Sequence, residues 1–217
     1  MDENEFFRQA TLRICGNLDI ARGLQECFNY ISQHMPADNL YLERYEMDMS
    51  AIRIIAHANQ SGYRNLDVLI PLLDEAKNGM KEVSGDKMPS LYICNNPAKD
   101  PITAHMLSAL QEPLSSVMSL MLFVEDKVAG ALTLLARGND RFEEHHISLY
   151  STLREPFFVA VSNALEHRKV LKLKDLLADD NRYMQKELHR LSGDEITGPD
   201  KASPGPTKQG NRTSRRR

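Results

Sequence analysis

Two long apolar runs separated by a three-residue polar turn constrain the fold of this chain more than any other feature. The runs SSVMSLMLFV (115–124) and VAGALTLLA (128–136) flank the turn Glu125-Asp126-Lys127. A turn this short joins only antiparallel strands, so the sequence predicts a β-hairpin. Apolar and polar residues barely alternate in either run, which predicts that both faces of this part of the sheet are covered.

Further short strands are predicted before this hairpin. LYLERYEM (40–47) and AIRIIAHA (51–58) are separated by a short polar step and are expected to form a second hairpin. Residues 67–72 predict a short strand in which Pro71 favours an edge position, because proline cannot donate to a neighbouring strand. Residues 90–94 form another short apolar run. Together these segments predict an antiparallel sheet.

Helices are predicted at both ends of the strand region and once within it. Residues 4–35 show helical spacing of apolar side chains and are expected to form two helices broken near Gly16. The pair Asp100-Pro101 is typical of a helix start. Residues 140–191 are predicted to be helical again, with Pro156 kinking this segment or splitting it in two.

After Leu165 the predicted exit helix carries few apolar residues, but those it carries are regularly spaced. Asp180 and Glu187 occupy two positions where a continuous seam would be apolar. A seven-residue apolar repeat on a charged helix predicts a partner helix, and we expect a homodimer through a parallel coiled coil. The alternative is a single solvated helix. The expected dimer seam consists of Val170, Leu173, Leu177, Met184 and Leu191.

Charge is distributed unevenly along the chain. The formal net charge is −3, yet residues 201–217 contain six Lys and Arg and no acid, so the remainder carries −9. The body is therefore a poor candidate for binding nucleic acid, and only the tail has a suitable charge. We expect a sensor domain over 1–168, a helical signalling linker over 169–192 and a disordered basic tail over 193–217.

Several protein classes are disfavoured by composition. No apolar run reaches 18 residues, so no transmembrane helix is predicted, and the polar N-terminus is unlike a secretory signal. The three cysteines, Cys15, Cys27 and Cys94, are too scattered for a disulfide framework or a zinc site. We expect a cytoplasmic protein with reduced thiols and without a metal site.

The order of elements over residues 4–168 resembles a GAF domain. Residues 5–46, 100–122 and 154–198 resemble the sensor segments of bacterial sigma-54-dependent transcriptional activators. In that family a GAF sensor leads through a helical linker to an AAA+ ATPase and a helix-turn-helix domain. The resemblance implies an α/β (α+β) fold, with a GAF-like antiparallel sheet flanked by helices and followed by a long C-terminal signalling or coiled-coil helix.

The resemblance also implies that this chain stops before the ATPase. Ile196-Thr197-Gly198 stands where the ATPase opening of that family usually reads Ile-Ile-Gly, and GxxxxGK[ST] is absent from the sequence. We therefore expect a chain without its own ATPase or DNA-binding domain. Whether such an output domain is supplied by another chain stays open.

By analogy with GAF domains, a ligand pocket is implied between the sheet and the inner helix. The motifs typical of cyclic-nucleotide-binding and bilin-binding GAF domains are absent, which disfavours those ligands and leaves the ligand and any cofactor unidentified. A redox role for the cysteine of this set and a metal role for its histidine stay open. The implied pocket residues are Tyr92, Cys94, His105, Met106, Ser116, Met118 and Leu120.

Three functions are compatible with these observations. The first, which we favour, is a regulatory module that senses a small molecule and has no catalytic activity. The second is a reductase of free methionine sulfoxide, an activity of some small GAF proteins that needs an attacking and a resolving thiol close together. The third is a fragment that only dimerises. The scattered cysteines and the linker favour the first over the second.

Overall fold

The computed structural model describes residues 2–17, 19–76, 90–124 and 127–194. The turn residues Glu125 and Asp126 and most of the predicted basic tail lie outside these ranges. The chain divides into two compact units, Met1–Lys169 and Val170–Arg217. The division falls inside the last helix.

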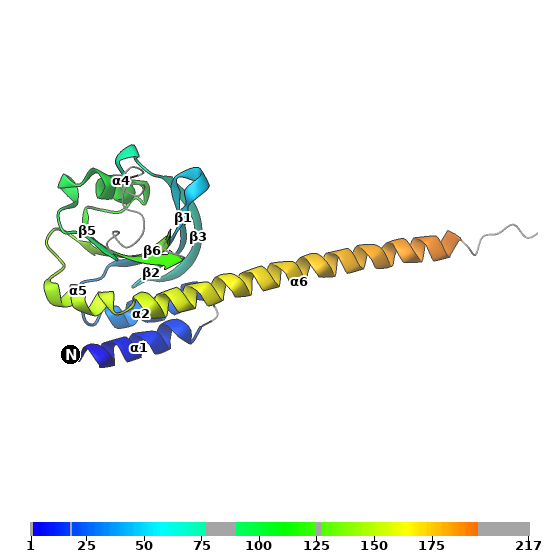
Figure 1. Cartoon of the computed structure of the whole chain (residues 1–217), viewed down its shortest axis with the longest axis horizontal. Helices are drawn as coiled ribbons and strands as arrows, with labels where there is room; N and C mark the ends of the chain where they lie inside the picture. Colours follow the sequence, from blue (N-terminus) through cyan, green and yellow to red (C-terminus); the bar gives the residue numbers. More distant parts are fainter. Residues whose placement is uncertain (1, 18, 77–89, 125–126, 195–217) are drawn as a thin grey trace, which may run out of the picture. The chain divides into compact units, whose positions relative to one another are not determined.

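A six-stranded antiparallel sheet forms the centre of the first unit (Figure 1). Its strand order is β3-β2-β1-β6-β5-β4, and every neighbouring pair is antiparallel. This arrangement confirms the predicted mixed α+β class. The strands are β1 (Asn39–Glu46), β2 (Ala51–Asn59), β3 (Gly62–Pro71), β4 (Leu91–Cys94), β5 (Ser115–Val124) and β6 (Lys127–Arg137).

Both predicted hairpins are confirmed. β5 pairs with β6, so that Ser119 lies opposite Thr133, and β1 pairs with β2. β3 is an edge strand, as Pro71 predicted. It begins at Gly62, five residues before the predicted start at Asp67. The sequence did not indicate this longer strand, because most of its side chains are exposed and only Ile70 is buried. An edge strand exposed along most of its length has little apolar pattern by which to predict it.

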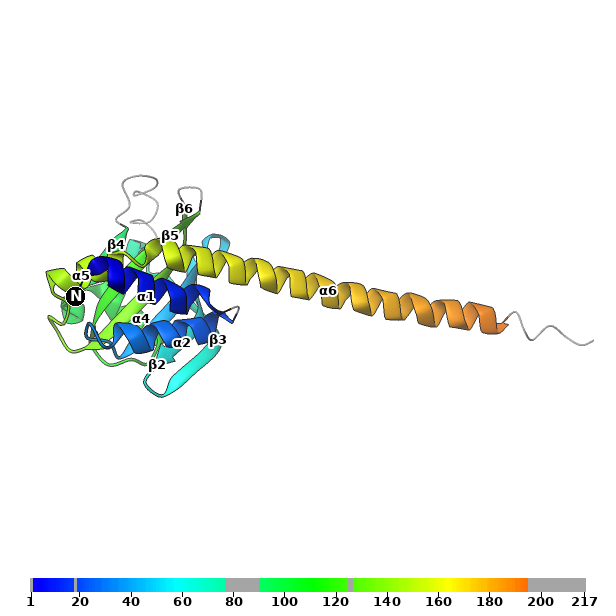
Figure 2. The same ribbon diagram turned by 90° about the horizontal axis from the view of Figure 1, so that it is seen from below.

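Helices from the two ends of the first unit cover one face of the sheet (Figures 1 and 2). The helices α1 (Glu3–Cys15) and α2 (Ile20–Ile31) start at the capping carboxylates of Asp2 and Asp19. Side chains of α1, α2, α5 (Glu144–Ser151) and the start of α6 (Arg154–Asp194) join the larger core cluster. Its largest fully buried members from these helices are Phe6, Phe28, Tyr150 and Phe157.

Pro156 lies at a helix boundary, as the sequence predicted in outline. The helical region divides at Thr152 and Leu153, between α5 and α6, so the segment is split rather than kinked. Pro156 then occupies the first turn of α6, where a missing backbone N–H costs nothing because that group has no partner inside the helix.

The opposite face of the sheet carries the helix α4 (Pro101–Ala109) and the short 3₁₀ turns at Met47–Met49 and Pro97–Lys99. α4 starts as predicted, with the carboxylate of Asp100 accepting from the Thr103 amide at 2.8 Å. A smaller core cluster lies between α4 and the sheet, so both faces of the central strands are covered. It contains Tyr41, Ile54, Ile70, Cys94, Leu107, Val117 and Leu135.

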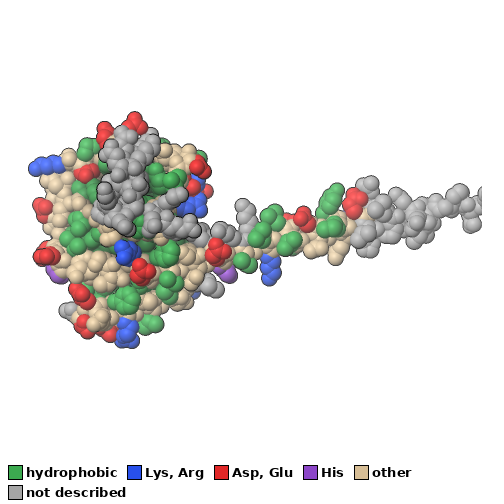
Figure 3. Space-filling view, viewed as in Figure 1, with side chains coloured by type: hydrophobic (Ala, Val, Ile, Leu, Met, Phe, Trp, Pro, Cys, Tyr) green, Lys and Arg blue, Asp and Glu red, His purple; other side chains and the backbone are tan. Residues whose placement is uncertain are grey.

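The second unit consists of the remainder of α6 as far as Asp194, within the described residues. Four of the five predicted seam residues there are each more than half exposed: Val170, Leu173, Leu177 and Met184. The side chain of Leu191 lies outside the described residues. Hydrophobic side chains alternate with charged ones along this part of the helix (Figure 3). Across the described ranges, no helix combines the length and the apolar character needed to cross a membrane.

Candidate functional site

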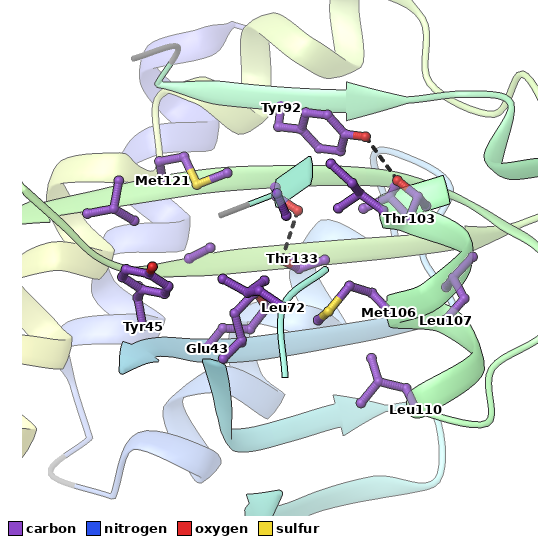
Figure 4. A pocket seen from close by; sticks show the side chains of 18 of the residues that line it. Glu43, Tyr45, Leu72, Tyr92, Thr103, Met106, Leu107, Leu110, Met121 and Thr133 are labelled. Atoms are coloured by element: carbon purple, nitrogen blue, oxygen red, sulfur yellow. Dashed lines mark hydrogen bonds between the residues drawn. The ribbon is translucent and has the colours of Figure 1, made fainter. Parts of the chain in front are cut away.

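A pocket of about 350 Å³ lies between the sheet and α4, inside the first unit (Figure 4). Its floor is formed by the central strands β1, β6 and β5, and one wall is formed by α4. Most of its surface is apolar. Its lining includes the side chains of Glu43, Tyr92, Thr103, Met106, Ser119, Met121, Ala131 and Thr133.

The two-residue period of the strands determines which side chains reach this pocket. On β5 the alternate residues Val117, Ser119 and Met121 line it, and on β6 the residues Ala131, Thr133 and Leu135 do so. The residues between them point to the opposite face and pack under α1, α2, α5 and the start of α6. Each strand therefore contributes to two separate apolar layers.

Tyr92 on β4 is fixed against the start of α4. Its hydroxyl donates to a carboxylate oxygen of Asp100 at 2.7 Å and lies 3.0 Å from the hydroxyl of Thr103. Burial, together with the hydrogen bond to Asp100, raises the pKa of the Tyr92 phenol well above its usual range. The phenol is therefore neutral and forms a rigid polar edge of the pocket.

Glu43 is the most unusual side chain in the pocket. It lies on the central strand β1, and it is only 8% exposed. Its carboxyl group faces the apolar pocket (Figure 4). It also accepts a hydrogen bond from the hydroxyl of Thr133. No Lys, Arg or His in the described part of the chain pairs with it. Burial raises the pKa of Glu43 to about 7, and the hydrogen bond from Thr133 opposes this rise.

A line of hydroxyl groups leads across the sheet to this carboxyl group. Ser119 and Thr133 are direct partners on β5 and β6, and their hydroxyl oxygens lie 2.9 Å apart. Both side chains are buried. When Thr133 donates to Glu43, its oxygen accepts from Ser119, so the two hydroxyls are aligned in one direction. Among the described residues, the floor of the pocket thus presents one carboxyl group, and the two hydroxyls of the sheet fix its orientation.

The other charged groups of the pocket lie at its margin. Arg44 donates to a carboxylate oxygen of Glu46 at 2.6 Å, and Arg53 on β2 donates to the same oxygen at 2.7 Å. Glu75 lines the pocket but is exposed. The positive charge of Arg44 is therefore already paired, and Glu43 is the one buried ionisable carboxyl group among the described lining residues.

Two of the sequence-predicted pocket residues, Tyr92 and Met106, line this pocket. Cys94 belongs to the smaller core cluster beside it but does not reach its surface. His105 is on the exposed side of α4, and its ring nitrogen lies 2.9 Å from the backbone oxygen of Pro71.

The structure places the three predicted β5 residues away from the pocket. Met118 and Leu120 are buried in the larger cluster on the opposite face of the sheet. Ser116 is also buried, and its hydroxyl donates to the backbone oxygen of Gly138 at 2.9 Å. The shift is one residue in the strand, which is enough to exchange the two faces.

Glu43, Ser119 and Thr133 were not among the predicted site residues. The segment LYLERYEM could have indicated Glu43, because alternate residues of a strand face the same side and Glu43 therefore faces the same side as Tyr41 and Tyr45. This strand lies in the middle of the sheet. A carboxyl group in that phase must either be paired or face a cavity, because leaving it buried and unpaired is costly. Only the strand order shows that β1 lies in the middle of the sheet.

The positions of the described cysteines and potential metal ligands do not favour thiol or metal chemistry. Within the described residues, no three His, Cys, Asp or Glu side chains are arranged to hold a metal ion. Cys27 is buried in the larger cluster and Cys94 in the smaller one, on opposite faces of the sheet. Burial raises the pKa of the Cys27 thiol far above its usual range, which suppresses its thiolate.

Solved structures show what fold this arrangement represents. The GAF domain of a phosphoenolpyruvate-protein phosphotransferase from Coxiella burnetii is 12% identical, with a TM-score of 0.58 over 78% of this chain and 98% of that one. The phycoerythrobilin-bound GAF domain from a cyanobacterial phytochrome is 14% identical, with a TM-score of 0.54 over 77% and 98%. The first unit therefore has a GAF fold.

Free methionine-R-sulfoxide reductase from Neisseria meningitidis, in complex with its substrate, is also similar. It is 12% identical, with a TM-score of 0.53 over 76% of this chain and 91% of that one. At such identities the likeness concerns the fold alone, and signalling domains and an enzyme share it. Comparison with protein-family models and with curated proteins gives no match for this sequence.

Proposed function

We propose that this chain is a regulatory GAF sensor that binds a small molecule in the pocket under α4 and has no catalytic activity. The observation that carries the proposal is the pocket itself, which combines apolar walls with one isolated, oriented carboxyl group. Ligand sites in proteins commonly have this composition, with few polar groups that fix the orientation of the ligand.

The exit helix is proposed to transmit the bound state. The exposed seam residues Val170, Leu173, Leu177 and Met184 favour a parallel coiled coil between two copies of the chain. Asp180 interrupts this seam and is exposed. A weakened seam is suited to signalling, because ligand binding then needs only about 1–3 kcal/mol of coupling free energy to shift it.

The sequence resemblance to sigma-54-dependent activators supports a role in the regulation of transcription. In this proposal the chain acts on an output domain through its helix, as the sensor segments of that family do. A homodimer of the exit helix would hold the two sensor domains beside each other and leave both facing the same output.

The alternative function, reduction of free methionine sulfoxide, is disfavoured by the positions of the thiols. A disulfide exchange step requires two sulfur atoms that can meet. Cys27 on α2 and Cys94 on β4 are buried on opposite faces of the sheet. Cys15 on α1 lies on the same face as Cys27, which is the face away from the pocket. The pocket surface itself carries no thiol among the described residues.

Native mass spectrometry of the purified chain tests the proposal. We expect a small molecule to co-purify with the parent and to be absent from Ala131→Phe, in which a larger side chain fills the pocket. Ala178→Phe adds the same group at an exposed position of α6 and serves as the matched control. Equal retention by the parent and Ala131→Phe, or turnover of methionine sulfoxide that Cys94→Ser abolishes, would refute the proposal.

A further inference from the structure

We infer that the ligand of this pocket is a largely apolar molecule with a single cationic amine, and that the amine pairs with the carboxylate of Glu43. This inference rests on the proposed function, since it specifies the ligand of the same site. It follows from the charge and the shape of the pocket rather than from any likeness to other proteins.

Burying the carboxyl group of Glu43 without a charged partner costs free energy. A carboxyl group that is 8% exposed and has no cationic partner in the described structure is poorly solvated in its charged form. The neighbouring positions on the same face of β1 are Tyr41 and Tyr45, which carry no positive charge. A bound cation would supply the missing partner, and the pairing would be strong in surroundings that exclude water.

The carboxylate of Glu43 can accept more hydrogen bonds than the one from Thr133. An ionised carboxylate only accepts hydrogen bonds and has about four acceptor positions, of which Thr133 uses one. A primary ammonium group brings three donors and no acceptor, so it is complementary to the oxygens that are left. The hydroxyl of Ser119 orients Thr133 and thereby keeps this acceptor surface directed into the pocket.

The described lining of the pocket is unfavourable for an anionic ligand. The charged and titratable side chains that line the pocket besides Glu43 are Arg44, Tyr45, Glu75 and Tyr92. Arg44 is paired with Glu46, and Tyr92 is held by Asp100. An anionic ligand would therefore meet a buried carboxyl group and no free cation at the described lining. The remaining walls favour an apolar body, with Met106 and Met121 able to adapt to its shape.

The ionisation of Glu43 gives the inference a distinctive pH dependence. Burial raises the pKa of the free site to about 7. An ammonium ligand binds the ionised form, so its affinity should fall about tenfold for each pH unit below 7 and level off above 7. A carboxylic acid ligand or a neutral acceptor would need the protonated form and would show the reverse trend.

Three probes of equal chain length test the inference: n-octylamine, n-octanol and octanoate, titrated by calorimetry between pH 5.5 and pH 8. For the parent at pH 8 we expect octylamine to bind at least tenfold more tightly than octanol, and octanoate to bind most weakly. Glu43→Gln should remove the preference for the amine and keep the binding of octanol. Glu26→Gln, which removes a carboxylate paired with Arg22 on the surface of α2, should behave as the parent.

The failures of the two proposals are distinguishable. If octanol binds and octylamine binds no better, or if octylamine binds more tightly as the pH falls, the inference on ligand charge is wrong while the pocket remains a ligand site. If none of the three probes binds the parent at any pH, the pocket is not a ligand site and the proposed function fails as well. Circular dichroism of Glu43→Gln checks that its fold is retained.

Discussion

The hydroxyl oxygens of Ser119 and Thr133 lie 2.9 Å apart on neighbouring strands, and Thr133 also hydrogen-bonds to the buried carboxyl group of Glu43. Three adjacent strands thus supply a polar line inside an otherwise apolar pocket. Buried polar groups that serve only the fold are usually paired among themselves. This line ends instead at a group with acceptor positions still available, which is why we place ligand recognition there.

Removing the Thr133 hydroxyl should raise the pKa of Glu43 further. The hydrogen bond from Thr133 favours the charged carboxylate, so Thr133→Val leaves burial as the dominant influence. Carbon-detected NMR of the glutamate side chains measures this pKa directly. We expect a titration midpoint above that of the parent, and an unchanged or lower midpoint would show that Thr133 does not stabilise the carboxylate.

The stability of Glu43→Gln relative to the parent should depend on pH. Between about pH 4.5 and pH 7 the folded parent keeps a proton on Glu43 that the unfolded chain has lost. The contribution of Glu43 to the free energy of unfolding therefore falls as the pH rises through this window and is constant above it.

Because the variant lacks this group, its advantage over the parent should grow by up to about 1.4 kcal/mol per pH unit in the same window. Urea unfolding at a series of pH values measures the difference. Glu26→Gln should show no such trend, and a stability difference that is flat from pH 4.5 to pH 8 would mean that the pKa of Glu43 is close to that of an ordinary carboxyl group.

His57 should produce the opposite trend. Burial, reinforced by the charge of Arg64, lowers the pKa of His57 to about 4, while the unfolded chain titrates near 6.5. The folded state therefore loses stability as the pH falls from about 6.5 to 4, because the unfolded chain binds the proton first. In urea unfolding, His57→Gln should lose less stability than the parent over that range. Equal acid sensitivity of the two proteins would contradict this assignment.

Gly130 on β6 should not tolerate a side chain. A Cβ atom at this position would overlap the backbone oxygen of Glu43 on the neighbouring strand β1. We expect Gly130→Ala to lower the free energy of unfolding by about 1–3 kcal/mol, because the two central strands must move apart. Val68→Ala on the exposed edge strand should change it by less than about 0.5 kcal/mol. A parent-like stability for Gly130→Ala would show that the strands separate easily.

The proposed seam on α6 makes a paired prediction. Asp180→Leu should lower the dimer dissociation constant at least tenfold, and Leu177→Asp should raise it by a similar factor, as measured by sedimentation equilibrium. Asp179→Leu adds the same apolar group one position away, outside the seam, and should not tighten the dimer. A monomer at micromolar concentration for both the parent and Asp180→Leu would leave α6 as a solvated helix.

The outline of the fold was predictable because local signals decided it. The short turn after Val124 imposed an antiparallel hairpin, Pro71 marked an edge strand and Asp100-Pro101 marked the start of α4. The extent of β3 was not predictable, since few of its side chains are buried.

The site was only partly predictable, because its residues depend on strand phase. Met118 and Leu120 have the composition expected of a pocket wall, yet they face the helices, and the intervening residue Ser119 faces the pocket. Both runs around the turn are largely apolar in both strand phases, so their pattern does not distinguish one face of the sheet from the other. A charged residue such as Glu43 predicts a functional site only when its strand is buried inside the sheet. The sequence does not show that β1 is paired on both sides, and only the tertiary structure reveals it.

The central claim is that a small molecule occupies the pocket between α4 and the sheet. Its most direct test is a pair of NMR titrations, one with n-octylamine and one with n-octanol, of protein labelled at the methionine methyl groups. The chain offers matched probes, because Met106 and Met121 line the pocket, Met118 is buried on the opposite face of the sheet, and Met47 is exposed. We expect the Met106 and Met121 signals to shift with one common affinity and those of Met118 and Met47 to stay in place. Shifts confined to Met118 or Met47, or no shift at Met106 and Met121 with either compound, would contradict the claim.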